Sequence, residues 1–314
     1  MVCLVIKNGG PAALPEWKAL FAHLMPDLTV RDWGDPALKP SEVEYALVWK
    51  PEPGRLAEMV NLKAILSAAV GVDHITRDPD WPKAVPLIRM GGEEPVQQME
   101  DYVLWAVFSI LRDVPVWRVG QQDKVWARQD TPPRMSDSMR IGVMGLGSLG
   151  RPVAMRLART GFQVSGWARH ARTLEGVTCY AGPDGLIPFL QSCDTLICLL
   201  PETQETRAMV TYDMLAQLRK PAGFINVGRG PLVVEADLLR ALDDGTLHAA
   251  VLDVFDREPL PASSLLWTHP RVLVTPHAAA DASRSARAEY VASVIQALEQ
   301  GRDVPLRYDP AKGY

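Results

Sequence analysis

A glycine-rich turn between an apolar strand and a helix limits what this chain can fold into more than any other feature. The run Arg140 to Met144 reads as a buried strand, and the residues that follow it read Gly-Leu-Gly-Ser-Leu-Gly. Glycines at these three places permit a tight turn and a close approach of the backbone to a pyrophosphate, which the N-terminus of the next helix attracts. Because strand, turn and helix occur in this order, the segment predicts a dinucleotide-binding domain. The predicted contacts in the turn are Gly145, Gly147, Ser148, Leu149 and Gly150.

The end of the next strand, about twenty residues beyond Gly150, usually shows which dinucleotide binds. An Asp or Glu there would accept hydrogen bonds from a ribose 2′-hydroxyl, but residues 163–174 contain neither. Arg169 and Arg172 stand in this segment, after Trp167, and a guanidinium can bind a 2′-phosphate through its planar fork. These three residues predict NADPH as the preferred cofactor, with NADH as a weaker one. The competing interpretation is that both arginines are solvated surface charges.

Strand and helix patterns alternate along the chain, which predicts parallel sheets covered by helices. A length of 314 residues suggests two domains. Helical spacing from Gln97 to Val119 marks the start of the second domain, and further helices are expected at 15–24 and 283–299. The expected strands are 2–7, 45–50 and 62–68 in the first domain and 140–144, 162–167, 194–200, 223–227, 248–254 and 271–275 in the second.

Charge and cysteine content argue against several classes of protein. The net charge is −4 with no basic block, so binding to nucleic acid or to a membrane surface has no electrostatic support. No apolar run approaches the roughly 20 residues of a membrane span, and the N-terminus does not resemble a signal peptide. The four cysteines lack metal-ligand spacing, so we expect free thiols and no metal site. These observations predict a soluble cytoplasmic protein.

Three charged side chains at or near strand ends of the second domain suit hydride transfer to a carbonyl beside a carboxylate. They are Arg229, Glu258 and His277, and they can converge because ligands bind beyond the carboxyl ends of parallel strands. Arg229 would hold the carboxylate and polarise the carbonyl, while His277 would donate the proton. Glu258 beside the histidine would favour the charged imidazole. The competing interpretations are a structural arginine, a solvated glutamate and a core histidine.

The order of motifs resembles that of the D-isomer-specific 2-hydroxyacid dehydrogenase family over nearly the whole length. The matching stretches are AAVGVDHI, GLGSLG, LLPETQET, NVGRG, LDVFDREPLP and LWTHPRVLVTPHAA. The resemblance implies an α/β fold of two domains, in which a Rossmann-type, doubly wound cofactor domain is inserted in a smaller flavodoxin-like substrate domain. We expect the cofactor domain at residues 99–284 and the substrate domain at 1–98 and 285–314. The resemblance also implies a homodimer.

The same resemblance gives the three charged residues the roles argued above and adds further contacts. It implies that Asp253 contacts the nicotinamide carboxamide, although a cap at the strand end is an alternative for this residue. The backbone N–H groups of Val70, Gly71 and Val72 would bind the substrate carboxylate. Trp49 would line the substrate pocket or belong to the core. The remaining cofactor contacts implied are Leu200, Pro201, Thr206, Val227 and Gly228.

Several features resemble one branch of that family, the glyoxylate and hydroxypyruvate reductases. They are ALVWKP, MGGEEPVQQMEDYVLW and the element WAR at the end of the second strand. This branch implies NADPH-dependent reduction of glyoxylate to glycolate and of hydroxypyruvate to D-glycerate, with domain closure excluding water from the hydride path. Two alternatives stay open: a reductase of bulkier 2-oxo acids such as phenylpyruvate, and a non-catalytic dinucleotide-sensing regulator of the same fold.

Overall fold

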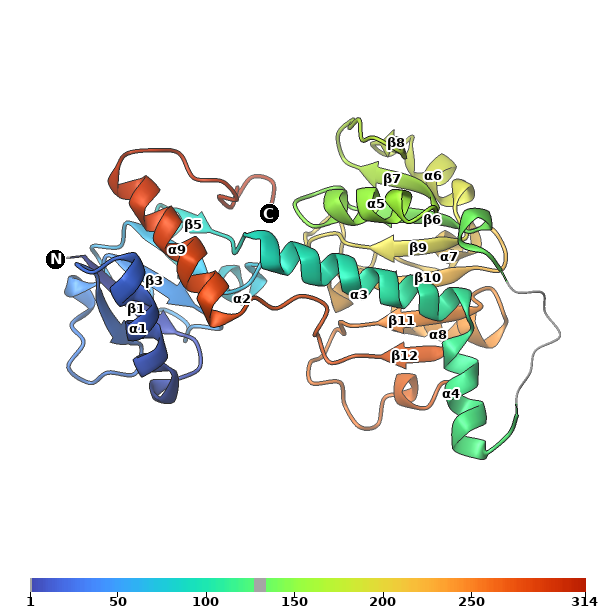
Figure 1. Ribbon diagram of the computed structural model, residues 1–314, viewed down its shortest axis with the longest axis horizontal. Helices are drawn as coiled ribbons and strands as arrows, with labels where there is room; N and C mark the ends of the chain where they lie inside the picture. The colour runs from blue at the N-terminus through green and yellow to red at the C-terminus, as the bar shows by residue number, and fades with distance from the viewer. Residues whose placement is uncertain (1, 127–133) are drawn as a thin grey trace. The chain divides into compact units, whose positions relative to one another are not determined.

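The computed structural model describes residues 2–126 and 134–314, which form two compact units (Figure 1). Val96–Ala280 make one unit, which we call the inserted unit. The chain up to Pro95 and Asp281–Tyr314 together make the other, which we call the split unit. The boundaries expected from the sequence, after residues 98 and 284, lie a few positions further along the chain.

A parallel sheet of seven strands forms the centre of the inserted unit. Its order, β12-β11-β10-β9-β6-β7-β8, begins in the middle with β6 and grows outward in both directions, as in doubly wound dinucleotide-binding folds. The central strands are continuous apolar runs because both faces of the sheet are covered. The strands are β6 (Arg140–Met144), β7 (Gln163–Ala168), β8 (Val177–Ala181), β9 (Thr195–Cys198), β10 (Gly223–Asn226), β11 (Ala249–Leu252) and β12 (Val272–Val274).

Two apolar cores lie on the two faces of this sheet. Neighbouring strand residues point to opposite faces, so Val143 joins the core that contains α3 and α5, and Met144 joins the core that contains α6, α7 and α8. Figure 1 shows α3 and α5 in front of the strands. The helices of this unit are α3 (Glu93–Leu111), whose first residues belong to the split unit, α4 (Val114–Asp123), α5 (Gly150–Arg159), α6 (Leu186–Ser192), α7 (Tyr212–Ala216) and α8 (Glu235–Asp243).

The single helix expected at 97–119 is wrong, because the structure has two helices there. The first ends at Leu111, and Asp113 adopts a left-handed backbone conformation with φ of 53°. Pro115 follows in the first turn of α4. Proline lacks an N–H donor and is tolerated only at the start of a helix, so it forces a new helix to begin there.

The split unit has a parallel sheet of five strands in the order β2-β1-β3-β4-β5, which is the flavodoxin-like order. The C-terminal tail belongs to this unit, since Tyr308 N–H donates to Leu87 O at 2.8 Å. The helices are α1 (Leu14–Leu24), α2 (Asp73–Thr76) and α9 (Arg284–Glu299). The strands are β1 (Cys3–Lys7), β2 (Thr29–Asp32), β3 (Tyr45–Val48), β4 (Ala64–Ser67) and β5 (Leu87–Ile88).

The predicted fold class, two parallel α/β sheets with one domain inserted in the other, is confirmed. All four cysteines are free thiols. Within the described residues, no helix has the length and apolar character needed to cross a membrane. The same residues contain no cluster of three or more His, Cys, Asp or Glu side chains that could hold a metal ion.

Candidate active site

The glycine turn after β6 combines two crowded positions with an open one. A Cβ on Gly145, whose φ is 109°, would lie 2.7 Å from the Leu199 carbonyl oxygen, and a Cβ on Gly150 would lie 1.7 Å from the Gly145 oxygen. A Cβ on Gly147 would meet nothing within 4 Å. Gly145 and Gly150 therefore let the backbone of the turn pack tightly. Gly147 leaves the surface over the start of α5 clear for a pyrophosphate.

The loops after β9 and β10 lie against each other. A Cβ on Gly228 would lie 2.8 Å from the Leu200 carbonyl oxygen, and the side chains of Leu200 and Val227 are buried. Thr206 folds the LLPETQET loop, because its Oγ1 donates to Pro201 O at 2.7 Å and accepts from Thr203 N–H at 2.8 Å. Thr206 and Pro201 thus support the loop from inside. Ser148 and Leu149 are half-buried in the glycine turn itself.

The end of β7 carries the residues expected to choose the cofactor. Arg169 lies just beyond the strand, and its Nη2 forms an ion pair with Glu205 Oε2 at 2.7 Å. Glu205 is a partner that the sequence did not reveal; its only signal was a carboxylate in the LLPETQET loop, far along the chain. Arg172 is exposed, as the alternative of a surface charge requires. The Trp167 side chain is buried and donates to Gly182 O at 2.9 Å, so it packs in the core beneath this site.

His277 and Glu258 form a hydrogen-bonded pair. His277 Nδ1 lies 2.8 Å from Glu258 Oε2, and Glu258 Oε1 accepts from the Phe255 N–H at 3.0 Å. The carboxylate can only accept, so Nδ1 carries a hydrogen and Nε2 lies on the opposite side of the ring. The residues are 19 positions apart in sequence, and the loop after β11 and the turn after β12 bring them together. This arrangement presents Nε2 as a proton donor.

The environment of Glu258 keeps its carboxylate charged. Burial alone would raise the pKa of Glu258. The hydrogen bond from His277, the Phe255 N–H and the charges of His277 and Arg229 outweigh burial, and the pKa lies below its ordinary value of 4.5. A charged carboxylate at this distance accepts the hydrogen on His277 Nδ1 and fixes the orientation of the imidazole ring.

Arg229 lies in the loop after β10, close enough for its charge to act on Glu258. A Cβ on Gly230 would lie 1.8 Å from the Phe255 carbonyl carbon, so only glycine lets this loop approach the loop that carries Glu258. Asn226 fixes the turn from inside, since its Nδ2 donates to Arg229 O at 3.1 Å and its Oδ1 accepts from Gly228 N–H at 3.1 Å. The structure thus brings together the arginine, the glutamate and the histidine that were expected to react.

Asp253 is buried and supports the turn that carries His277. Its Oδ1 accepts from Thr275 Oγ1 at 2.6 Å and from Ala278 N–H at 2.8 Å, and its Oδ2 accepts from Ala279 N–H at 2.9 Å. The backbone of His277 has φ of 55°, and its N–H donates to the Asp253 carbonyl at 2.9 Å. These contacts match the alternative of a strand-end cap, and they hold the histidine in a left-handed conformation that few residues adopt.

The residues expected to bind the substrate carboxylate lie in the split unit. Val70, Gly71 and Val72 form the loop between β4 and α2. Trp49 follows β3, is 37% exposed, and packs against His74 at a tilt, with ring centroids 4.3 Å apart. The tryptophan is therefore part of the surface beside this loop and is not a core residue.

Comparisons with known proteins agree with this geometry. The family model for the D-isomer specific 2-hydroxyacid dehydrogenase, NAD binding domain, matches residues 104–279. A curated relative, glyoxylate/hydroxypyruvate reductase A of Yersinia enterocolitica, is 37% identical over 95% of this chain and 96% of its own length. The chain belongs to the D-isomer specific 2-hydroxyacid dehydrogenase family. The resemblance inferred from the motifs is confirmed.

Two solved structures of the same family share the whole fold. The dehydrogenase from Xanthobacter autotrophicus Py2, in complex with NADPH and MES, has a TM-score of 0.93 and 39% identity, covering 100% of this chain and 99% of that one. The NADPH-dependent glyoxylate/hydroxypyruvate reductase from Sinorhizobium meliloti, in complex with NADP and sulfate, has a TM-score of 0.90 and 35% identity, covering 100% of both chains. Family members of this fold therefore bind NADPH or NADP.

Proposed function

We propose that this protein is an NADPH-dependent 2-hydroxyacid dehydrogenase that reduces glyoxylate to glycolate and hydroxypyruvate to D-glycerate. The observation that carries the proposal is the pair His277–Glu258, with Nδ1 and Oε2 2.8 Å apart, in a site where the charge of Arg229 also acts on Glu258. The names of the Yersinia and Sinorhizobium relatives support the same substrates and the same cofactor. A protein that only senses dinucleotides would not need a charged acid–carboxylate pair.

Each charged residue has a separate part in the proposed reaction. Arg229 holds the substrate carboxylate and stabilises the negative charge that develops on the carbonyl oxygen. His277 transfers a proton from Nε2 to that oxygen, and Glu258 stabilises the imidazolium before the transfer. NADPH, when bound, supplies the hydride that C2 of the oxo acid accepts. One hydride and one proton thus convert the carbonyl to a hydroxyl group, leaving a neutral imidazole that solvent reprotonates.

The cofactor preference rests on the end of β7. Arg169 offers a guanidinium where an acidic residue would favour NADH, and residues 163–174 contain no carboxylate. The open position at Gly147 fits a pyrophosphate above the start of α5. We assign the adenosine side to Arg169, Arg172 and the loop that Thr206 and Pro201 shape, and the nicotinamide side to Val227 and Gly228, beside the turn that Asp253 supports.

A kinetic matrix tests the proposed function. Initial rates are measured with NADPH and with NADH against glyoxylate, hydroxypyruvate, pyruvate and phenylpyruvate. We expect the highest kcat/KM with NADPH and one of the first two acids. Tight NADPH binding without turnover of any of the four acids would instead identify a sensor, and a preference for phenylpyruvate would identify a reductase of bulkier substrates.

We also propose that the protein works as a homodimer in the cytoplasm, where a reductase meets the reduced cofactor. Large apolar side chains on and beside α3 and α4 support the assembly: Trp105 and Trp117 are each 44% exposed and Trp126 is 94% exposed. Large apolar side chains that join into one exposed surface are typical of protein–protein interfaces. Analytical ultracentrifugation should give twice the mass of 34.6 kDa, and Trp126→Glu should shift the population towards the monomer. Cell fractionation tests the location.

A further inference from the structure

We infer that Ser67 and His74 are positioning residues that hold the loop Ala68–Val72 in the shape that binds the substrate carboxylate. The inference rests on the proposed function, because the carboxylate is the ligand in question. Neither residue is expected to touch the substrate. Their contribution is to turn two peptide groups of the loop so that the N–H groups face outward.

The Ser67 hydroxyl contacts several backbone groups of the loop. It is buried at the end of β4, and its Oγ lies 2.7 Å from Ala69 O and 2.9 Å from Gly71 O. The same oxygen accepts from Ala69 N–H at 3.1 Å and contacts His74 Nε2 at 3.1 Å. A hydroxyl has one hydrogen and two acceptor sites, so the two carbonyls share the Ser67 hydrogen, while the Ala69 N–H and His74 Nε2 use the two acceptor sites.

The two carbonyls that Ser67 holds determine where the next N–H groups point. In a planar trans peptide the C=O of one residue and the N–H of the next lie on opposite sides. Because Ala69 O and Gly71 O face the Ser67 hydroxyl, the N–H groups of Val70 and Val72 face away from it. Within the part of the chain that the structure describes, no backbone or side-chain oxygen accepts these N–H groups. An anion such as a carboxylate is the ligand that such donors fit.

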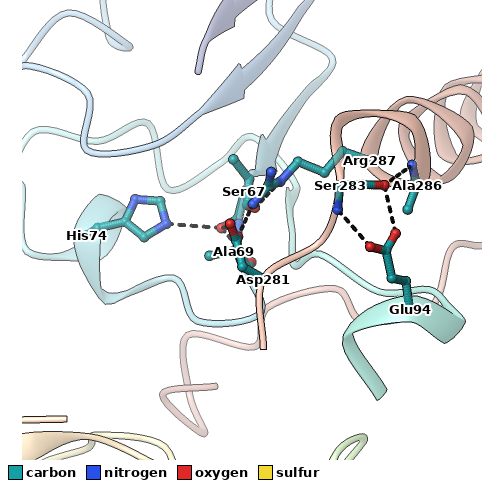
Figure 2. Close-up of polar contacts among 9 residues, drawn as sticks. Ser67, Ala69, His74, Glu94, Asp281, Ser283, Ala286 and Arg287 are labelled. Carbon is teal, nitrogen blue, oxygen red and sulfur yellow. Dashed lines mark hydrogen bonds and ion pairs between the residues drawn. The ribbon is translucent and has the colours of Figure 1, made fainter. Parts of the chain in front are cut away.

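His74 contacts the Ser67 hydroxyl (Figure 2) and also a backbone N–H after β3. Its Nδ1 accepts the Lys50 N–H at 3.2 Å, so Nε2 carries the hydrogen and donates to Ser67 Oγ at 3.1 Å. The Trp49 ring packs against the same imidazole at a tilt. His74 therefore holds the Ser67 hydroxyl and the Trp49 ring in one arrangement.

Arg287 fixes the start of the same loop from α9. This arginine is buried, donates from Nε to Ala68 O at 2.9 Å, and forms an ion pair with Asp281. Figure 2 shows Arg287 reaching the loop beside Ser283, whose N–H and Oγ bond to Glu94 at 3.1 and 2.8 Å. With its base held by α9, the loop depends on Ser67 and His74 for the orientation of the peptide groups that follow.

Two substitutions and their combination test the inference. Ser67→Ala removes the contacts to both carbonyls, and His74→Phe keeps a ring against Trp49 but removes both polar contacts. With saturating NADPH, each variant should raise the KM for glyoxylate roughly tenfold, while kcat changes by less than about threefold, because binding common to ground and transition states is lost. The dissociation constant of NADPH should stay within about twofold. If the pair acts as one unit, the double variant should match the more affected single variant.

Ser293→Ala is the matched control, since Ser293 is an exposed serine on α9 that bonds only within its own helix, to Tyr290 O at 2.7 Å. Its KM should equal that of the unmodified protein. A KM within twofold in both test variants, or equal losses of kcat and of NADPH affinity, would overturn the inference. Should Ser67→Ala not fold, His74→Phe decides alone. Turnover by the unmodified protein is measured first: its absence overturns the proposed function, whereas turnover with an insensitive KM overturns only the positioning role.

Discussion

Two ion pairs of the inserted unit have nearly the same length but very different surroundings. His277 and Glu258 lie 2.8 Å apart, and Arg169 and Glu205 lie 2.7 Å apart. The two cations are equally exposed, at 39% and 38%, but the carboxylates differ, at 30% for Glu258 and 74% for Glu205. Distance alone therefore does not describe what a pair can do.

Additional contacts explain the difference between the pairs. Glu258 also accepts the Phe255 N–H, and the backbone of His277 is held by Asp253. Such a pair keeps one geometry and suits proton transfer, which needs fixed distances. Glu205 stands in an exposed loop, where an ion pair contributes at most about 1 kcal/mol and salt screens it. That pair can open at little cost when a phosphate competes for Arg169.

Replacing His277 should have the largest effect. We expect His277→Asn to lower kcat/KM for glyoxylate about 1,000-fold, since it removes the general acid. Asparagine tolerates the left-handed backbone found at this position, with φ of 55°, so the turn should persist. Fluorescence titration should show unchanged NADPH binding. His23→Asn, at an exposed position of α1, is the control and should behave as the unmodified protein. A loss of less than tenfold would assign the proton to another donor.

Glu258→Gln should have the next largest effect. The carboxylate accepts the hydrogen on His277 Nδ1 at 2.8 Å and so fixes the ring with Nε2 free to donate. Without this contact the orientation of the proton donor is lost, and kcat/KM for glyoxylate should drop roughly tenfold to a hundredfold. Initial rates at neutral pH measure the loss. A loss of less than twofold would show that Glu258 does not act on the proton donor; Glu289→Gln, on the exposed side of α9, is the control.

The same variant has a predictable effect on stability. The pKa of Glu258 is lowered in the folded protein from its ordinary value of 4.5. Its charged form therefore stabilises the fold above about pH 4.5, and this stabilisation is lost as the pH falls through the lowered pKa. Thermal unfolding should show a higher Tm for the unmodified protein than for Glu258→Gln at pH 6 and a smaller difference at pH 3.5.

Substitutions in the Arg169–Glu205 pair should change the kinetics less than those at His277 or Glu258, and only with NADPH. We expect Arg169→Gln to raise the KM for NADPH roughly tenfold, because a charge-assisted hydrogen bond to the 2′-phosphate is lost. The KM for NADH should change less than twofold. Arg159→Gln, in the last turn of α5, is the control. Equal changes for both cofactors would mean that Arg169 supports the fold of the site and does not select the phosphate.

The sequence predicts the fold well where a local pattern is complete. The strand before Gly145, the glycine turn and the helix after it are consecutive, so a single stretch of sequence is enough to predict all three. Strands β2, β5 and β8 were not predicted, because β5 has only two residues and the other two mix polar with apolar residues. The division of the helix at Asp113 depends on a backbone conformation that residue type alone does not dictate.

The sequence also names the reacting residues but not the residues that orient them. Arg229, Glu258 and His277 stand out because charged groups at strand ends suggest chemistry. Ser67 and His74 act through hydrogen bonds that exist only after the chain has folded, and they have no distinctive spacing. Glu205 is likewise invisible as a partner of Arg169, since the two are 36 positions apart and belong to separate loops.

Replacing Glu205 should have the smallest effect and the opposite sign from Arg169→Gln. In the absence of cofactor, Glu205 competes with a 2′-phosphate for the same guanidinium, so Glu205→Gln should lower the KM for NADPH about twofold to fivefold. The change should shrink as ionic strength rises from 50 to about 500 mM, because both partners are solvent-exposed. The KM for NADH should not move, and Glu175→Gln at another exposed site of this unit should have no effect. A rise in the KM for NADPH would mean that Glu205 holds Arg169 in the binding geometry, and the Arg169–Glu205 pair would then resemble the His277–Glu258 pair in function.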